Sequence, residues 1–150
     1  AKINGVLFDG EVEFTGKLKT SHENGETASL VQYVDGRMHG PNNEWYADGQ
    51  IASKRHYENG KKEGLHLAWW EDGSPRFEFN FENGLYEGTV KEWALNGVLV
   101  KEFNYHLGKE DGAQKMWTAD GKIKANYVMI NGRRYGYIGS KNCVSADESM

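Results

Sequence analysis

Histidine, cysteine and carboxylate side chains are the residues that could carry metal or nucleophilic chemistry in this chain. The histidines are His22, His39, His56, His66 and His106. None has a neighbour at metal-ligand spacing, and no H-E-x-x-H or C-x-x-C motif is present. The single cysteine, Cys143, excludes an internal disulfide and a cysteine-cluster metal site. We therefore expect neither a bound metal nor a cofactor.

Catalytic motifs of other kinds are missing as well. The sequence contains no G-x-S-x-G, Walker or dinucleotide-binding pattern. Carboxylates stand at varied repeat positions, which favours a charged surface and leaves a paired acid–base site as an alternative. Cys143 could offer a reactive thiol to a partner or a second copy, although a free thiol without a role is the favoured interpretation. We expect no catalytic residue and a protein that is not an enzyme.

Composition narrows the class of partner and the way in which the chain buries its surface. The 150 residues carry a net charge of -4, which argues against nucleic acid or an anionic membrane as the main partner. The chain has 19 glycines, 2 prolines and 13% aromatic residues. This composition indicates short strands joined by tight turns, with rings providing most of the buried area.

A 24-residue unit recurs along nearly the whole chain. Three glycine columns keep this spacing: Gly36, Gly60, Gly84, Gly108 and Gly132; Gly16, Gly40, Gly64, Gly88, Gly112 and Gly136; and Gly25, Gly49, Gly73, Gly97 and Gly121. A tryptophan column holds Trp45, Trp69, Trp93 and Trp117, and an aromatic column holds Tyr33, Tyr57, Phe81 and Tyr105 and ends in Met129. We predict a repeat domain over 1–138 and a flexible polar tail over 139–150. Within the domain we expect clear repeats over 33–128, a degenerate first unit over 11–32 and a cap over 129–138.

Turn signals fix the fold class. Asn-Gly or Asp-Gly dipeptides recur at alternating intervals of 11 and 13 residues, and they tolerate the positive φ that two-residue hairpins demand. Each repeat is therefore expected to form one β-hairpin. The prediction is an all-β fold, an elongated, twisted, single antiparallel β-meander of repeated hairpins.

Strand alternation predicts one aromatic face. Pro75, Phe77, Phe79 and Phe81 are expected to point one way, and Leu99 and Ile123 are placed on the same face in the next repeats. A single sheet would leave this aromatic face exposed to solvent. Three solutions stay open: rings that pack on each other as the sheet curls, a second copy, or a ligand.

The pattern Y-x-N-G-x-x-x-G-x-x-x-x-W-x-x-N-G resembles the MORN repeat, in the bacterial variant of YwqK-type proteins. The stretches YENGKKEGLHLAWWEDG and FENGLYEGTVKEWALNG carry the resemblance, which covers roughly residues 11–136. The family implies an elongated twisted sheet that presents a groove, and roles in scaffolding, dimerisation or phospholipid contact. Its bacterial members are often described as antitoxin components, and similar repeats occur in envelope proteins. The periplasm or cell envelope is therefore favoured over the cytoplasm.

The candidate binding surface comprises aromatic side chains from three columns. They are Tyr46, Trp70, Trp45, Trp69, Trp93, Trp117, Phe79, Phe103 and Tyr127. The favoured interpretation of the tryptophan column is the repeat core, whereas Tyr46 and Trp70 depart from the repeat pattern and are the better candidates for contacts.

Three functions follow as hypotheses. The leading one is a protein-binding module that uses the aromatic face or an exposed edge strand, with a toxin as the partner that the resemblance suggests. The alternatives are a self-associating scaffold and a module that binds carbohydrate or peptidoglycan through ring stacking.

Overall fold

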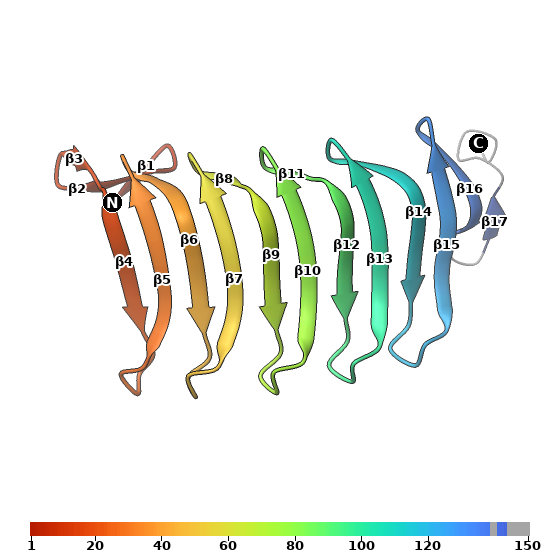
Figure 1. Ribbon diagram of the computed structural model, residues 1–150, viewed down its shortest axis with the longest axis horizontal. Helices are drawn as coiled ribbons and strands as arrows, with labels where there is room; N and C mark the ends of the chain where they lie inside the picture. The colour runs from red at the N-terminus through yellow and green to blue at the C-terminus, as the bar shows by residue number, and fades with distance from the viewer. Residues whose placement is uncertain (139–140, 144–150) are drawn as a thin grey trace.

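The computed structural model describes residues 1–138 and 141–143, and within them every regular element is a β-strand. The main sheet is a single antiparallel layer in which each long strand pairs with the next along the chain (Figure 1). Its successive strands are β4 (Gly16–Ser21), β5 (Thr27–Val34), β6 (Arg37–Trp45), β7 (Ile51–Glu58), β9 (Gly64–Trp69), β10 (Pro75–Glu82), β12 (Gly88–Trp93), β13 (Leu99–His106), β14 (Lys109–Trp117), β15 (Ile123–Ile130), β16 (Arg133–Ile138) and the short β17 (Lys141–Cys143). Two short strands, β8 (Lys61–Lys62) and β11 (Leu85–Tyr86), extend the hairpins of β7 and β10.

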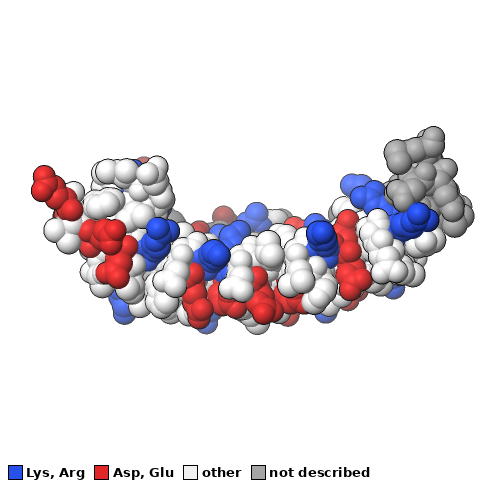
Figure 2. Space-filling model, turned by 90° about the horizontal axis from the view of Figure 1, so that it is seen from above, with Lys and Arg blue, Asp and Glu red and all other residues white. Residues whose placement is uncertain are grey.

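The predicted all-β meander is confirmed. The sheet stays open and curves into a shallow arc along its length (Figure 2). A small second sheet of β1 (Lys2–Ile3), β2 (Val6–Asp9) and β3 (Val12–Glu13) stands at its N-terminal end (Figure 1). No helix of the described residues is long and apolar enough to cross a membrane.

The hairpin turns are of two kinds, so the prediction of positive φ at both residues is right for only one of them. In the turn of Asn59 and Gly60 both φ angles are positive, at 49° and 82°, as a two-residue type I′ hairpin requires. In the alternate turns only the glycine has positive φ. At Gly73, for example, the amide donates to the carbonyl of Trp70 at 2.9 Å, which closes a longer loop.

One turn departs from its column, because Leu107 occupies the place that asparagine or aspartate holds elsewhere. Its φ is 50°, and 63% of its surface is exposed. A leucine in the left-handed region is strained by about 1 kcal/mol or more, whereas asparagine tolerates that region.

We predict that Leu107→Asn raises the free energy of unfolding by about 1 kcal/mol, because it relieves this strain and leaves the backbone hydrogen bonds unchanged. Thermal unfolding followed by circular dichroism would measure the gain. The matched control is Leu85→Asn, an exposed leucine of the preceding turn region whose φ is not positive. Equal effects of the two substitutions would show that surface polarity rather than strain is responsible.

Bulges overturn the expected distribution of side chains between the faces. The register shifts beside each tryptophan, so that Trp69 pairs with Pro75, Trp93 with Leu99 and Trp117 with Ile123. Directly paired residues share a face. Pro75, Leu99 and Ile123 therefore lie with the tryptophans and not, as expected, with the phenylalanines.

The two faces can now be defined. The ring face carries the aromatic column of Tyr33, and the tryptophan face carries Trp45 and its repeats. Every side chain that is buried in the described residues lies on the ring face; these are Tyr33, Asn42, Ser53, Tyr57, His66, Ala68, Phe81, Val90, Phe103, Gln114, Ala125 and Tyr127. The core of this protein is thus one layer of side chains that pack sideways across the strands, which is the first of the three solutions left open above.

Candidate functional site

Aromatic rings form a continuous strip across the ring face from β10 to β15. The ring strip comprises Phe77, Phe79, Phe81, Tyr86, Phe103, Tyr105 and Tyr127. Phe77 stacks on Phe79 with ring centroids 4.2 Å apart, and Phe79 meets Tyr86 edge-on at 5.6 Å. Tyr86 lies 4.9 Å from Tyr105, and Phe103 continues the contacts to Tyr105 and Tyr127. Because no second layer covers the sheet, Phe77, Phe79, Tyr86 and Tyr105 stay half-buried.

Basic side chains lie over the rings of this strip. Their charged groups stand 4.7 to 5.7 Å from ring centroids, within the range of cation–π attraction. The pairs are Arg55 over Phe77, Lys62 over Phe81, Lys101 over Phe103 and Arg134 over Tyr127. The strip is therefore both aromatic and positively charged.

Carboxylates balance the cations at one end of the strip only. Lys101 pairs with Glu92 at 3.5 Å, and Arg134 pairs with Glu110 at 4.0 Å. Among the described residues, no ion pair reaches Arg55 or Lys62. Arg55 and Lys62 are thus the cations of the strip that no carboxylate of the described residues pairs with, although Glu44 lies on the same face opposite Ser53.

Buried polar side chains lie at the end of the strip nearest β7. Asn42 of β6 pairs with Arg55 of β7, and Ser53 lies on the same face one row away. The side chains of Asn42 and Ser53 are buried, yet Asn42 Oδ1, Ser53 Oγ and Arg55 Nε have no hydrogen-bond partner. Buried polar groups are normally paired, so three unpaired ones at one place need an explanation.

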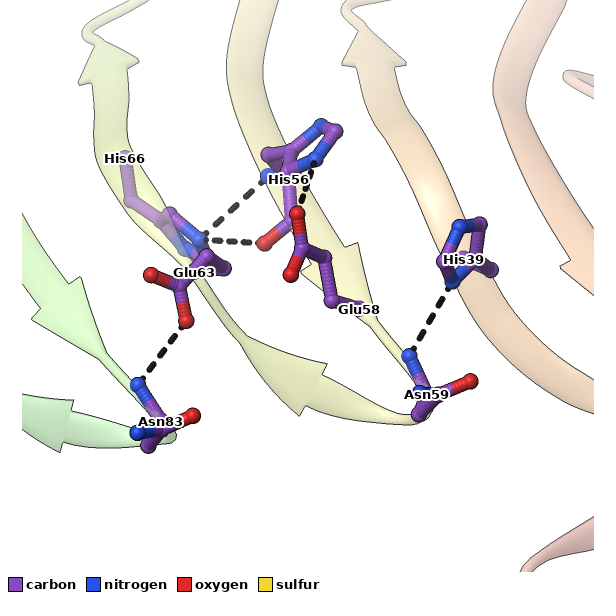
Figure 3. A network of polar contacts seen from close by, with 7 residues as sticks. All are labelled: His39, His56, Glu58, Asn59, Glu63, His66 and Asn83. Atoms are coloured by element: carbon purple, nitrogen blue, oxygen red, sulfur yellow. Dashed lines mark hydrogen bonds and ion pairs between the residues drawn. The ribbon is translucent and has the colours of Figure 1, made fainter.

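Two buried polar residues at the same repeat position, His66 and Gln114, form hydrogen bonds with the backbone of the neighbouring strand. Gln114 is fully buried; its Oε1 accepts from the Asn104 amide at 3.0 Å and its Nε2 donates to the Asn104 carbonyl at 2.6 Å. Two repeats earlier, His66 Nε2 lies 2.8 Å from the His56 carbonyl oxygen and 3.3 Å from its amide (Figure 3). The shorter distance indicates that Nε2 carries the proton and donates to the carbonyl. Gln114 thus satisfies both backbone groups of Asn104, and His66 satisfies the carbonyl of His56.

Burial lowers the pKa of His66 below its ordinary value of 6.5. In the folded chain this imidazole stays neutral, whereas in the unfolded chain it takes a proton below about pH 6.5. The unfolded state therefore binds more protons in that range. As a result, the stability contribution of His66 is present above pH 6.5 and is lost as the pH falls toward the folded-state pKa.

We predict that His66→Gln makes the protein less sensitive to mild acid. The substitution copies Gln114, so it should keep the backbone hydrogen bonds while removing the titrating group. Between pH 7.5 and 5.0 the wild type should lose more unfolding free energy than the variant, by at most about 1.4 kcal/mol for each pH unit below 6.5. Chemical denaturation at both pH values measures this difference, in which the effects of all other groups cancel. Parallel losses in the two proteins would contradict it.

A further column of unlike side chains ties each repeat to the turn of the next. Glu63 Oε2 accepts from the Asn83 amide at 2.8 Å, and His39 Nδ1 accepts from the Asn59 amide at 3.2 Å (Figure 3). Thr15 does the same for Asp35 and Glu87 for Leu107. These residues were not predicted, because only the acceptor is shared and not the residue type.

Glu87, a member of this column, also forms an ion pair with His106. Hydrogen bonds from the Leu107 amide and from His106 lower its pKa, while Glu87 raises the pKa of His106 across a 2.9 Å contact. His22, His39, His66 and His106 each form a hydrogen bond, and His56 has an exposed contact of 3.9 Å with Glu58. The described residues contain no group of side chains that could hold a metal ion.

Tyr46 and Trp70 bond to the neighbouring repeat. The Tyr46 hydroxyl donates to the Trp69 carbonyl at 2.7 Å, and Trp70 Nε1 donates to the Trp93 carbonyl at 3.2 Å. His22, one repeat earlier, contacts the Trp45 carbonyl in the same manner. These residues therefore link repeats at the looped end of the sheet. They also line a hollow of about 340 Å³ with Glu71, Arg76 and Leu95, in which the Arg76 guanidinium lies 4.6 Å from the Trp70 ring.

The structure separates the predicted binding residues into three groups. Phe79, Phe103 and Tyr127 lie together in the ring strip. Tyr46 and Trp70 stand at the looped end, and the half-buried tryptophan column lies on the opposite face. The interpretation of the tryptophan column as the repeat core is therefore wrong, because the buried side chains of the described residues lie on the ring face. Alternation places Trp45, Trp69, Trp93 and Trp117 there, and Trp45 lines a hollow with Lys19 and Leu30 of that face. Cys143 ends β17, but its side chain lies outside the described part of the molecule.

Comparison with known proteins identifies the family that two segments of the chain resemble. No curated protein matches the sequence. Residues 38–59, which include most of β6 and all of β7, match the MORN repeat variant family. So do residues 86–106, which contain β12 and β13. In these two stretches, at least, the hairpin that builds the sheet is similar to the MORN repeat variant.

Proposed function

We propose that this protein is a non-catalytic module that binds a partner polypeptide along the ring strip. The observation that carries the proposal is the half-buried, cation-bordered row of rings on a sheet that has only one layer. Aromatic and arginine side chains are the groups most enriched where proteins bind one another. A single-layer sheet also leaves room for an occupant over the whole strip.

Charge indicates the chemistry of that partner. Arg55 and Lys62 lack ion pairs among the described residues, and Ser53 Oγ and Arg55 Nε have no hydrogen-bond partner. A carboxylate next to apolar side chains would complement this end of the strip, since guanidinium and hydroxyl groups both bind carboxylates. A sugar is less suitable at Phe77, because the Arg55 guanidinium already lies over the ring on which it would stack.

The resemblance suggests a specific version of this function, in which the partner is a toxin and the module neutralises it. This version rests on the family alone. Co-expression tests it directly: the chain should rescue cells that produce the cognate toxin, and a chain with Arg55→Glu should not. Rescue that survives this substitution would place neutralisation away from the ring strip.

Photo-cross-linking tests the binding proposal itself. A benzophenone amino acid placed at Phe79 should capture a discrete partner in cells, while the same group at Lys54, exposed on the tryptophan face, should capture none. Capture should weaken when Arg55→Ala is added to the Phe79 probe. Equal capture from both positions, or a cross-link only to a second copy, would overturn the proposal; the second outcome would favour the self-associating scaffold.

A further inference from the structure

The first strand of the main sheet, β4, has a free edge. It stands at the end of the strand order and pairs only with β5 (Figure 1). Its residues after Gly16 are all exposed. Every second residue of such an edge directs its amide and carbonyl away from the sheet, which is a template for one more strand.

Hollows flank this edge on both faces. On the ring face, Leu18 lines a cavity of about 270 Å³ with Leu7, Phe8, Asp9 and Phe14. Residues of the small N-terminal sheet form one wall of this cavity. Two hydrogen bonds hold this wall in place: the Leu7 amide donates to the Gly36 carbonyl at 2.7 Å, and the Gly36 amide donates to the Phe14 carbonyl at 2.7 Å. An added strand could place an apolar side chain beside Leu18, which is 43% exposed.

The tryptophan face of the same edge carries two lysines, and Glu26 lines one hollow together with Lys19. Lys17 and Lys19 pair with Gln32 and Leu30 and so lie on the face opposite Leu18. Both are exposed, and neither forms an ion pair within the part of the chain that the structure describes. Lys17 borders a second hollow, of about 190 Å³, with Leu30, Gln32, Pro41 and Asn43.

We propose that β4 binds an extended acidic segment of a partner protein as an added strand. The segment carries carboxylates at alternate positions beside Lys17 and Lys19, and apolar side chains between them that enter the cavity at Leu18. A second copy of this chain fits less well: two β4 edges paired about Leu18 would bring lysines opposite lysines, which destabilises a strand pair. The site is separate from the ring strip and does not depend on it.

A labelled peptide tests the proposal on the full chain. The probe is an eight-residue peptide of alternating glutamate and valine, compared with a lysine–valine peptide of the same length by fluorescence anisotropy. The acidic peptide should bind, and Lys17→Glu combined with Lys19→Glu should weaken it about tenfold, as two exposed ion pairs allow. The same variant should gain affinity for the basic peptide. The control combines Lys54→Glu with Lys124→Glu, which makes the same change in net charge at exposed positions in the interior of the sheet.

Hydrogen exchange shows where the peptide lies. Binding should slow amide exchange over residues 16–21 and leave the ring strip unchanged. Failure of the acidic peptide to bind, an equal effect of the control variant, or protection confined to strands other than β4 would each overturn the proposal. Because cross-linking at Phe79 concerns the other site, its result is independent of this one.

Discussion

Gly36→Ala is expected to lower the free energy of unfolding by about 3 kcal/mol, or to detach the N-terminal sheet. Gly36 has φ of +75°, and a Cβ at this residue would lie 2.4 Å from Val6 Cγ1 and 2.6 Å from the Leu7 carbonyl oxygen. The backbone has little freedom to move away, because Gly36 is bonded to both Leu7 and Phe14. The left-handed conformation adds a further strain of about 1 kcal/mol.

Gly60→Ala is the matched control for this substitution. Gly60 occupies the same position of the next repeat with φ of +82°, its amide donates to Met38 in the same way, and its nearest neighbour to an added Cβ is 3.9 Å away. It should therefore lose only the conformational contribution, about 1 kcal/mol. Urea denaturation gives both values, and limited proteolysis shows whether residues 1–14 have detached. Equal losses would mean that contact with β2 contributes nothing.

Gln114→Ala should lower the free energy of unfolding by about 3 kcal/mol. The substitution removes both partners of the Asn104 backbone at a site with no solvent access, and it leaves a cavity between β13 and β15. Unpaired buried amide and carbonyl groups cost more than the lost hydrogen bonds alone would suggest.

Two further variants separate the causes. Gln114→Leu refills the volume without restoring the hydrogen bonds, so it should remain destabilised by about 2 kcal/mol if the unpaired backbone dominates. Gln114→His places the residue of the other repeat at this column and should recover stability at pH 7.5 but not at pH 5. Thermal and chemical unfolding at both pH values provide the measurements. A leucine variant as stable as the wild type would show that only volume matters here.

The sequence was sufficient for the repeat and the fold class. Turn glycines, Asn-Gly dipeptides and strand alternation depend on local backbone preferences, and these are visible in residue types one repeat apart. The aromatic column of Tyr33, Tyr57 and Phe81 is one row in the structure, and all three side chains are buried. They also located Phe79, Phe103 and Tyr127 on one face, as the ring contacts confirm.

Other features depend on register, which residue types do not reveal. A bulge beside each tryptophan places Pro75 opposite Trp69 and so on the tryptophan face. The pairing of Ala68 with Phe77 places Trp69 on the face opposite the phenylalanines, which separates the predicted binding residues between two faces. Nothing in the identity of Pro75 or Leu99 indicates this, because the shift arises from the backbone of the looped end.

Hydrogen bonds between repeats escaped prediction for a different reason. Thr15, His39 and Glu63 are unlike residues that supply an acceptor to the same turn of the next repeat, and His66 and Gln114 are unlike residues that bond to the backbone of the same repeat position. A repeat position is recognised in the sequence when the same residue type recurs at it. At these positions the residue type varies, because only burial or a hydrogen bond to a nearby backbone group constrains the side chain. The sequence by itself determined a meander of 24-residue hairpins. Only the tertiary structure decided which face is the core, where cations lie over rings, and which edge is free, because these follow from contacts between strands that belong to different repeats.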